Sequence, residues 1–208
     1  MTNETSSDKP ILAYLGPAGT FTEQALYSQS DLLDYILDPT VSIPEAIKQV
    51  AEGKADFGFV AIENSIEGSV NITQDTLAFD VDLLIQREVV NEIQLNLLAP
   101  PGVKISDLKN VLSFPHAISQ CRNWLTNNLP EATTHAANST ADAAKQIAQT
   151  GKKETAAIAT KRAAEVFGLE VLVSNIGDHP DNATRFVLLS SDGIPKPSGN
   201  DKTSIVVF

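Results

Sequence analysis

Short apolar segments alternate with amphipathic segments along most of this chain, and this alternation restricts the fold more than any other feature of the sequence. Residues 11–15 and 57–62 are apolar and strand-like, and two amphipathic segments lie between them. These segments start after Thr20 and Ser42, each followed three positions later by a glutamate, which is the pattern of a capping box. The sequence therefore predicts a βαβ rhythm and an α/β fold.

The segment that begins at Ser42 is repeated, with changes, from Ser139. Residues 42–54 read Ser-Ile-Pro-Glu-Ala-Ile-Lys-Gln-Val-Ala-Glu-Gly-Lys, and residues 139–152 read Ser-Thr-Ala-Asp-Ala-Ala-Lys-Gln-Ile-Ala-Gln-Thr-Gly-Lys. Two explanations stay open, namely coincidence between two capped helices that each end at a glycine, or two similar α/β lobes that face each other. In the second case a ligand lies in the cleft, at the carboxyl ends of the strands.

The two-lobed interpretation also predicts where the chain changes lobe. We expect a first lobe of residues 10–84 and 184–190, and a second lobe of residues 85–178. The return of the chain at 184–190 would place Thr184 at the hinge side of the cleft. Residues 191–201 have the composition of a linker, and residues 202–208 begin a new strand.

Charge and composition exclude several classes of partner and site. The 208 residues carry a net charge of −11 without a basic cluster, which argues against nucleic acid. No long apolar stretch indicates a signal peptide or a membrane span, so we expect a cytoplasmic protein. Cys121 is the single cysteine and the three histidines are scattered, so we expect neither an internal disulfide nor a metal site.

Three short motifs carry candidate chemistry. Residues 182–186, Asn-Ala-Thr-Arg-Phe, put a hydroxyl beside a guanidinium, which suits an anion. Residues 16–23, Gly-Pro-Ala-Gly-Thr-Phe-Thr-Glu, follow a strand and open a helix, where backbone amides can receive a carboxylate. Residues 62–69, Ile-Glu-Asn-Ser-Ile-Glu-Gly-Ser, offer neutral donors from Asn64 and Ser65. Plainer interpretations are a strand start for the first motif and a capped turn for the second.

The three motifs together resemble the prephenate dehydratases. A fourth element, Ser-Phe-Pro-His-Ala-Ile-Ser-Gln-Cys at residues 113–121, is similar to the Ser-His-Pro-Gln…Gln-Cys element of that family. Phe114 and His116 depart from its pattern, and Asn138 stands where some members have glutamate. The resemblance covers nearly all of residues 10–190 and implies a two-lobed architecture like that of the type II periplasmic binding proteins.

The resemblance also implies the reaction and the residues that perform it. The expected reaction is the conversion of prephenate to phenylpyruvate in phenylalanine biosynthesis, by a lyase without metal or cofactor. The Thr of the Thr-Arg-Phe motif, Thr184, is the expected catalytic donor to the leaving hydroxyl. The expected substrate-binding residues are Thr20, Asn64, Ser65, Ser113, Gln120, Ser139, Thr140, Arg185 and Phe186. Glu63 and Glu67 would repel a dianion, so we expect structural roles for them.

Alternatives to this function stay open at the level of the sequence. Arogenate is a second candidate substrate, and a two-lobed sensor of small acids that performs no chemistry is a candidate of a different class. Family members usually continue into a regulatory ACT domain that binds phenylalanine, and residues 202–208 resemble its first strand. We therefore expect an enzyme without the effector site of that domain, and leave open a homodimer or a larger homo-oligomer.

Overall fold

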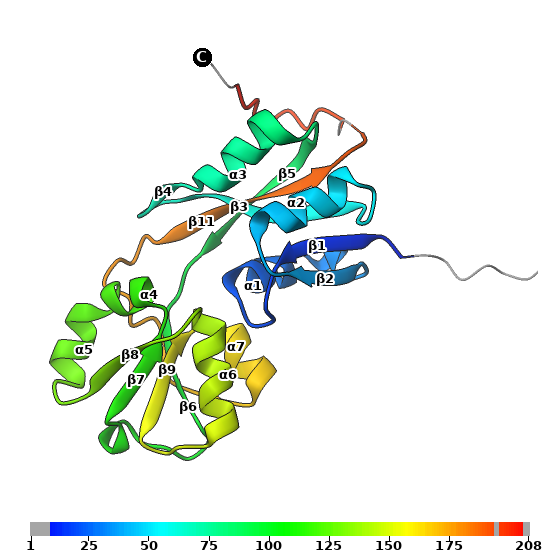
Figure 1. Cartoon of the computed structure of the whole chain (residues 1–208). Helices are drawn as coiled ribbons and strands as arrows, with labels where there is room; N and C mark the ends of the chain where they lie inside the picture. The colour runs from blue at the N-terminus through cyan, green and yellow to red at the C-terminus, as the bar shows by residue number, and fades with distance from the viewer. Residues whose placement is uncertain (1–8, 194–195, 206–208) are drawn as a thin grey trace, which may run out of the picture.

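The computed structural model describes residues 9–193 and 196–205, which form two β-sheets with helices on both faces of each (Figure 1). The first sheet has the order β2 (Ile36–Thr40), β1 (Ile11–Leu15), β3 (Phe57–Asn64), β11 (Ala183–Ser190), β5 (Leu84–Glu92), and the short β4 (Gly68–Ser69) pairs with β3. The second has the order β10 (Glu170–Val173), β6 (Asn96–Ala99), β9 (Thr155–Ala159), β7 (Asn110–Ser113), β8 (Thr133–Ala136). The predicted α/β class and two lobes are confirmed.

The helices divide between the lobes in the same way as the sheets. The first lobe contains α1 (Phe21–Tyr27), the 3-10 turn η1 (Ser30–Leu32), α2 (Ile43–Ala51), α3 (Asn71–Asp75) and the π-helical turn η2 (Thr76–Asp80). The second contains the 3-10 turn η3 (Ile105–Asp107), α4 (Pro115–Ser119), α5 (Arg122–Asn128), α6 (Thr140–Thr150) and α7 (Lys161–Phe167).

The repeated sequence segment corresponds to a repeated piece of topology. In the first sheet β1 lies between β2 and β3 and is parallel to both, and in the second β7 lies between β8 and β9 and is parallel to both. The two copies of the segment form α2, which connects β2 to β3, and α6, which connects β8 to β9. The strand order therefore favours two similar lobes over a coincidence between two capped helices.

The helix starts follow the local pattern expected from the sequence. The side-chain oxygens of Thr20, Ser42 and Ser139 each accept the backbone amide three residues later. The carboxylate at that third position bonds the residue before the cap rather than the cap itself. The amide-to-carboxylate distances are 2.7 Å for Glu23, 3.2 Å for Glu45 and 3.4 Å for Asp142.

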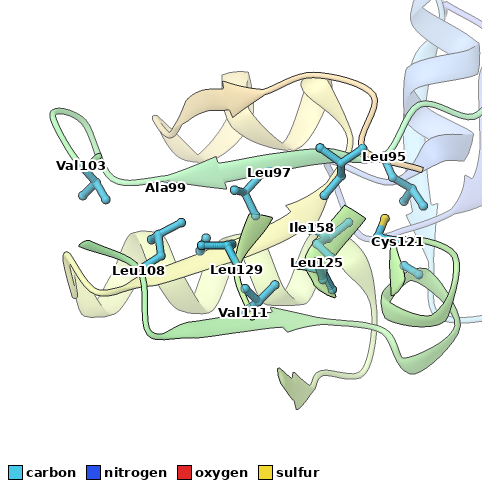
Figure 2. Packing of buried hydrophobic residues seen from close by; sticks show 13 residues of the cluster. Leu95, Leu97, Ala99, Val103, Leu108, Val111, Cys121, Leu125, Leu129 and Ile158 are labelled. Atoms are coloured by element: carbon cyan, nitrogen blue, oxygen red, sulfur yellow. The ribbon is translucent and has the colours of Figure 1, made fainter. Parts of the chain in front are cut away.

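Each face of each sheet carries its own hydrophobic cluster. In the second lobe, Leu97 of β6, Val111 of β7 and Ile158 of β9 pack against the α4 and α5 side, where Cys121 and Leu125 lie (Figure 2). The opposite face packs against α6 and α7, and the faces of the first sheet pack against α1 and α2. Each lobe thus has its own hydrophobic core, made of the two clusters on the faces of its sheet.

The boundary expected between the lobes at residue 85 was wrong. β5 pairs along its length with β11 in the first sheet, so residues 85–92 belong with the first lobe. The chain crosses to the second lobe between β5 and β6 and returns between β10 and β11 (Figure 1). Sequence pattern identifies a strand here but not its partner, because β11 is separated from β5 by the whole second lobe.

The expected strand at the end of the chain is only partly within the described residues. Residues 202–205 form no strand, and residues 206–208 lie outside the described residues. Lys202 contacts the carboxylate of Glu88 on β5, which attaches this segment to the first lobe.

Candidate active site

Thr184 lies at the start of β11, directly beside the end of β3. The antiparallel register pairs it with Asn64, whose side-chain amide donates to the Thr184 hydroxyl oxygen at 2.9 Å. The same amide group donates to the side-chain oxygen of Asn182 at 2.9 Å. Thr184 is therefore an acceptor in this pair, and among the described residues no acceptor takes its hydroxyl proton.

The orientation of the Asn64 amide is fixed by its own backbone contacts. Its oxygen accepts the amides of Ile66 at 2.9 Å and Glu67 at 3.0 Å, in the turn that follows β3. Because only the oxygen can accept these amides, the NH₂ group must face Thr184. The turn after β3 thus decides which partner of the Asn64–Thr184 pair donates.

Asn182 extends this arrangement to the second lobe. Its amide donates to the side-chain oxygen of Gln120 at 3.1 Å, and both side chains are buried. Gln120 ends α4, so a row of amides runs from Gln120 through Asn182 and Asn64 to Thr184. Asn182 was not among the expected site residues, although its place two residues before Thr184 is visible in the sequence.

Ser65 uses its groups to hold the segment before β11. Its hydroxyl donates to the carbonyl of Asp181 at 3.0 Å and accepts the amide of Ala183 at 2.9 Å. Its backbone amide donates to the Ala183 carbonyl at 2.8 Å. These contacts give Ser65 a structural role, and its expected substrate contact stays a prediction.

The loop before α1 contacts both lobes. Thr20 donates to the carbonyl of Leu15 at 3.3 Å and caps α1. The carbonyl of Gly19 accepts the hydroxyl of Thr160 from the second lobe at 2.7 Å. Gly19 has a φ of +87°, and an added Cβ would lie 3.1 Å from the Cα of Ala163. Only glycine meets both demands at this position.

Arg185 points away from Thr184, because successive side chains of a strand lie on opposite faces. Its guanidinium forms ion pairs with Glu63 at 3.2 Å and Glu88 at 3.4 Å. Two carboxylates already occupy this cation, so the expected side-by-side anion site of Thr184 and Arg185 is not formed in this structure. Glu63 has the structural role expected for it.

Phe186 belongs to the core of the first lobe. Its ring is only 1% exposed and stacks on Phe59 with a centroid distance of 5.2 Å. The expected contact between Phe186 and a substrate is therefore replaced by a packing role in this core.

The remaining expected residues lie at strand and helix ends of the second lobe. Ser113 is fully buried and donates to the carbonyl of Ile158 at 2.7 Å, which links β7 to β9. Ser139 caps α6, and Thr140 is the first residue of that helix. The structure therefore gives Ser113 and Ser139 structural bonds, and it joins only Asn64, Gln120 and Thr184 of the expected set in one row.

Another contact crosses between the lobes at the turn after β3. Glu67 lies 2.8 Å from His116 of α4. Both side chains are about half exposed, so the pair is in contact with solvent. His116, which departs from the family pattern, thus has an acidic partner from the other lobe.

Two wider features of the chain bear on the class of site. Within residues 9–193 and 196–205, no helix has the length and apolar character needed to cross a membrane. The same residues bring together no group of three or more His, Cys, Asp or Glu side chains that could hold a metal ion.

The chain matches the family model described as prephenate dehydratase over residues 12–194. It is 41% identical to the prephenate dehydratase of Mycolicibacterium gilvum, over 95% of this chain and 67% of that protein. It is 38% identical to the bifunctional chorismate mutase/prephenate dehydratase of Pseudomonas aeruginosa, over 96% of this chain and 54% of that protein.

This chain is also similar in fold to a solved structure of the same family. The prephenate dehydratase of Arthrobacter aurescens, determined in complex with L-Phe, superposes with a TM-score of 0.83 at 39% identity. The match covers 91% of this chain and 62% of that one. The chain thus spans roughly half to two thirds of the length of these relatives.

Proposed function

The chain belongs to the prephenate dehydratase family, and we propose that it converts prephenate to phenylpyruvate, carbon dioxide and water. In this reaction the ring carboxylate leaves as carbon dioxide, and the electrons of its carbon–carbon bond enter the ring. The bond between the ring and its hydroxyl breaks at the opposite carbon, and the oxygen departs as water after it gains a proton. Formation of the aromatic ring drives both losses.

The hydrogen bond from Asn64 to Thr184 is the observation that carries this proposal. Because Asn64 donates to the Thr184 oxygen at 2.9 Å, the hydroxyl proton of Thr184 is directed elsewhere. A threonine hydroxyl is too weak an acid to act as a carboxylic acid would. It can still donate a hydrogen bond to the departing oxygen, and an oriented donor is most effective where charge develops in the transition state.

Gln120 is the second donor that we propose for the substrate. Its side-chain oxygen accepts from Asn182, so its NH₂ group faces away from that contact. No partner for this NH₂ group is found among the described residues, and none of their buried side-chain nitrogens or oxygens lacks a hydrogen bond. The NH₂ group of Gln120 therefore reaches solvent, where it can donate to a carboxylate of the substrate.

In our proposal, uncharged hydrogen-bond donors bind the prephenate dianion. Arg185 is occupied by Glu63 and Glu88, so we assign it to the stability of β11. Thr20 and Thr140 stand at helix starts, where backbone amides lack partners within the helix. We propose that these helix starts and Gln120 hold the substrate carboxylates. A cytoplasmic location and a homo-oligomer stay predictions.

Turnover of prephenate by the purified 208-residue protein tests this function. The product phenylpyruvate is followed by its absorbance, with a reaction without protein as the control for spontaneous aromatisation. Arogenate in a parallel reaction separates the two candidate substrates, since its product is phenylalanine. We expect turnover of prephenate with saturation kinetics. Tight binding of prephenate without turnover would instead indicate a sensor.

A further inference from the structure

Glu23 is a carboxylate of the first lobe buried beneath the loop of residues 16–20. Only 5% of the residue is exposed. One oxygen accepts the backbone amide of Gly19 at 2.7 Å, and the other lies 3.4 Å from the hydroxyl of Tyr14. The carboxylate of Glu23 thus fixes the position of the Gly19 amide, next to the helix start that carries Thr20.

The positive charge beside Glu23 comes from the other lobe. Arg162, in the first turn of α7, donates from its Nε to Glu23 at 3.2 Å. Its guanidinium lies over the ring of Tyr27, 3.8 Å from the ring centre, which fixes the plane of the group. A further contact at 3.3 Å joins it to the exposed Glu165 of the same helix. Glu23 therefore contacts a cation held in place by both lobes.

Two neighbouring contacts show that the lobes are closely packed at this point. The hydroxyl of Thr160 donates to the carbonyl of Gly19 at 2.7 Å in a buried bond. Gly19 approaches Ala163 so closely that a Cβ would lie within 3.2 Å of both its Cα and its Cβ. The loop of residues 16–20 thus rests directly on the start of α7, and Arg162 lies at that contact.

We propose that Arg162 is a positioning residue for the reaction, which holds the loop of residues 16–20 against the second lobe through Glu23. The inference rests on the proposed function, because that function assigns this loop and Thr20 to substrate binding. Arg162 itself does not touch the substrate. It keeps Glu23 paired, and Glu23 keeps the Gly19 amide and the start of α1 in place.

Electrostatics explains why loss of Arg162 would be transmitted to the loop. A buried carboxylate without a cation is unfavourable, so it must turn toward water or gain a proton. Either change weakens its bond to the Gly19 amide. Burial lowers the pKa of Arg162, but the hydrogen bond and charge of Glu23, together with Tyr27 and Glu165, raise the pKa above its usual range. Arg162 is therefore charged at any working pH.

The test compares Arg162→Met with Lys161→Met, its matched control. Both substitutions remove one positive charge from adjacent positions of α7, and the exposed Lys161 forms no ion pair with any of the described residues. The readouts are kcat and KM with prephenate, and hydrogen exchange at the Gly19 amide. We expect Arg162→Met to lower kcat/KM by ~10–100-fold and to speed exchange at Gly19, since small displacements of positioning groups have effects of this size.

Two further variants separate this role from general destabilisation. Arg162→Lys keeps the charge but not the planar group, so it should recover part of kcat/KM and part of the protection of Gly19. Glu165→Gln removes the exposed partner of Arg162 and leaves Glu23 paired, so both readouts should match the wild type. If Arg162→Met does not fold, the same readouts on Arg162→Lys decide the question.

The proposal requires both readouts to change together. It is overturned if Arg162→Met matches Lys161→Met in either kcat/KM or exchange at Gly19. The exchange measurement needs no substrate, so it still shows whether Arg162 holds the loop if the wild type fails to turn over prephenate. That last result would contradict the proposed function and, with it, the part of Arg162 in the reaction.

Discussion

The side-chain amide of Asn64 donates to the hydroxyl oxygen of Thr184 across 2.9 Å, from the end of β3 to the start of the antiparallel β11. Two backbone amides hold the Asn64 oxygen in the opposite direction, so the pair has one polarity. This polarity leaves the Thr184 proton available to another acceptor. The proposed chemistry depends on it.

Reversing this polarity should abolish most of the activity. In Asn64→Asp the donor becomes a carboxylate, which accepts the Thr184 proton and places a negative charge beside a dianionic substrate. We expect kcat to fall by ~10²-fold or more, the scale for loss of one oriented donor. Asn71→Asp makes the same chemical change at an exposed position of α3 and should retain wild-type kcat. Equal kcat values for the two variants would show that Asn64 has no part in the reaction.

Gly19→Ala should destabilise the contact between the lobes. The substitution meets two penalties, a φ of +87° and a Cβ only 3.1 Å from Ala163. Gly53→Ala has a similar φ of +69° but no atom within 4 Å of the added Cβ, so it measures the backbone penalty alone. We expect Gly53→Ala to lower the free energy of unfolding by about 1 kcal/mol and Gly19→Ala by more. Urea unfolding of both variants measures the difference in their free energies of unfolding. Equal losses of free energy would mean that the lobes move apart at Gly19 without a cost in stability.

Asp178 should stabilise α5 by accepting backbone amides at the start of that helix. Its carboxylate accepts the amides of Asn123 at 2.9 Å and Trp124 at 3.2 Å, at the start of that helix. Asp178→Ala should therefore lower the free energy of unfolding by about 1 kcal/mol, as loss of a cap usually does. Asp181→Ala, an exposed acidic residue of the same loop, should change it by less than about 0.5 kcal/mol. Equivalent urea midpoints for the two variants would exclude the capping role.

Cys121 should be unreactive until the chain unfolds. Burial, with a smaller contribution from the charge of Asp178, raises the pKa of this thiol from 9.0 to about 12. The folded state thus favours the thiol form, a contribution to stability that is complete below pH 9 and is lost between about pH 9 and 12. We expect Ellman's reagent at pH 8 to label Cys121 slowly in buffer and rapidly in urea. Fast labelling of the folded chain would show that the thiol is accessible.

Local features of this fold could be predicted from the sequence because they depend on neighbours in the chain. The caps at Thr20, Ser42 and Ser139 follow from a spacing of three residues, and the structure forms all three. The repeat around Ser42 and Ser139 left two explanations open, coincidence or two similar lobes. The strand order that the two sheets share favours two similar lobes.

Features that depend on distant segments were harder to predict. The sheet to which β5 belongs is decided by β11, which follows after the second lobe. The pairing of Arg162 with Glu23 joins residues far apart in sequence. Glu23 belongs to a motif that indicated a helix cap, and Arg162 belongs to none of the motifs. No local signal could have found that pair.

One error could have been avoided from the sequence itself. Thr184 and Arg185 are adjacent in a strand, so their side chains must lie on opposite faces. The expected anion site needed them side by side. The same alternation puts Phe186 on the inner face, where it stacks on Phe59.

The role of Thr184 as donor to the leaving oxygen is tested by the kcat of Thr184→Ala with prephenate. We expect a folded protein whose kcat is lowered by at least ~10²-fold, with Thr184→Ser retaining more activity because it keeps the hydroxyl. Thr133→Ala, at an exposed position of β8, is the matched control and should keep the wild-type kcat. Turnover of prephenate by Thr184→Ala at close to the wild-type rate would contradict the assignment of Thr184 as the donor to the leaving oxygen.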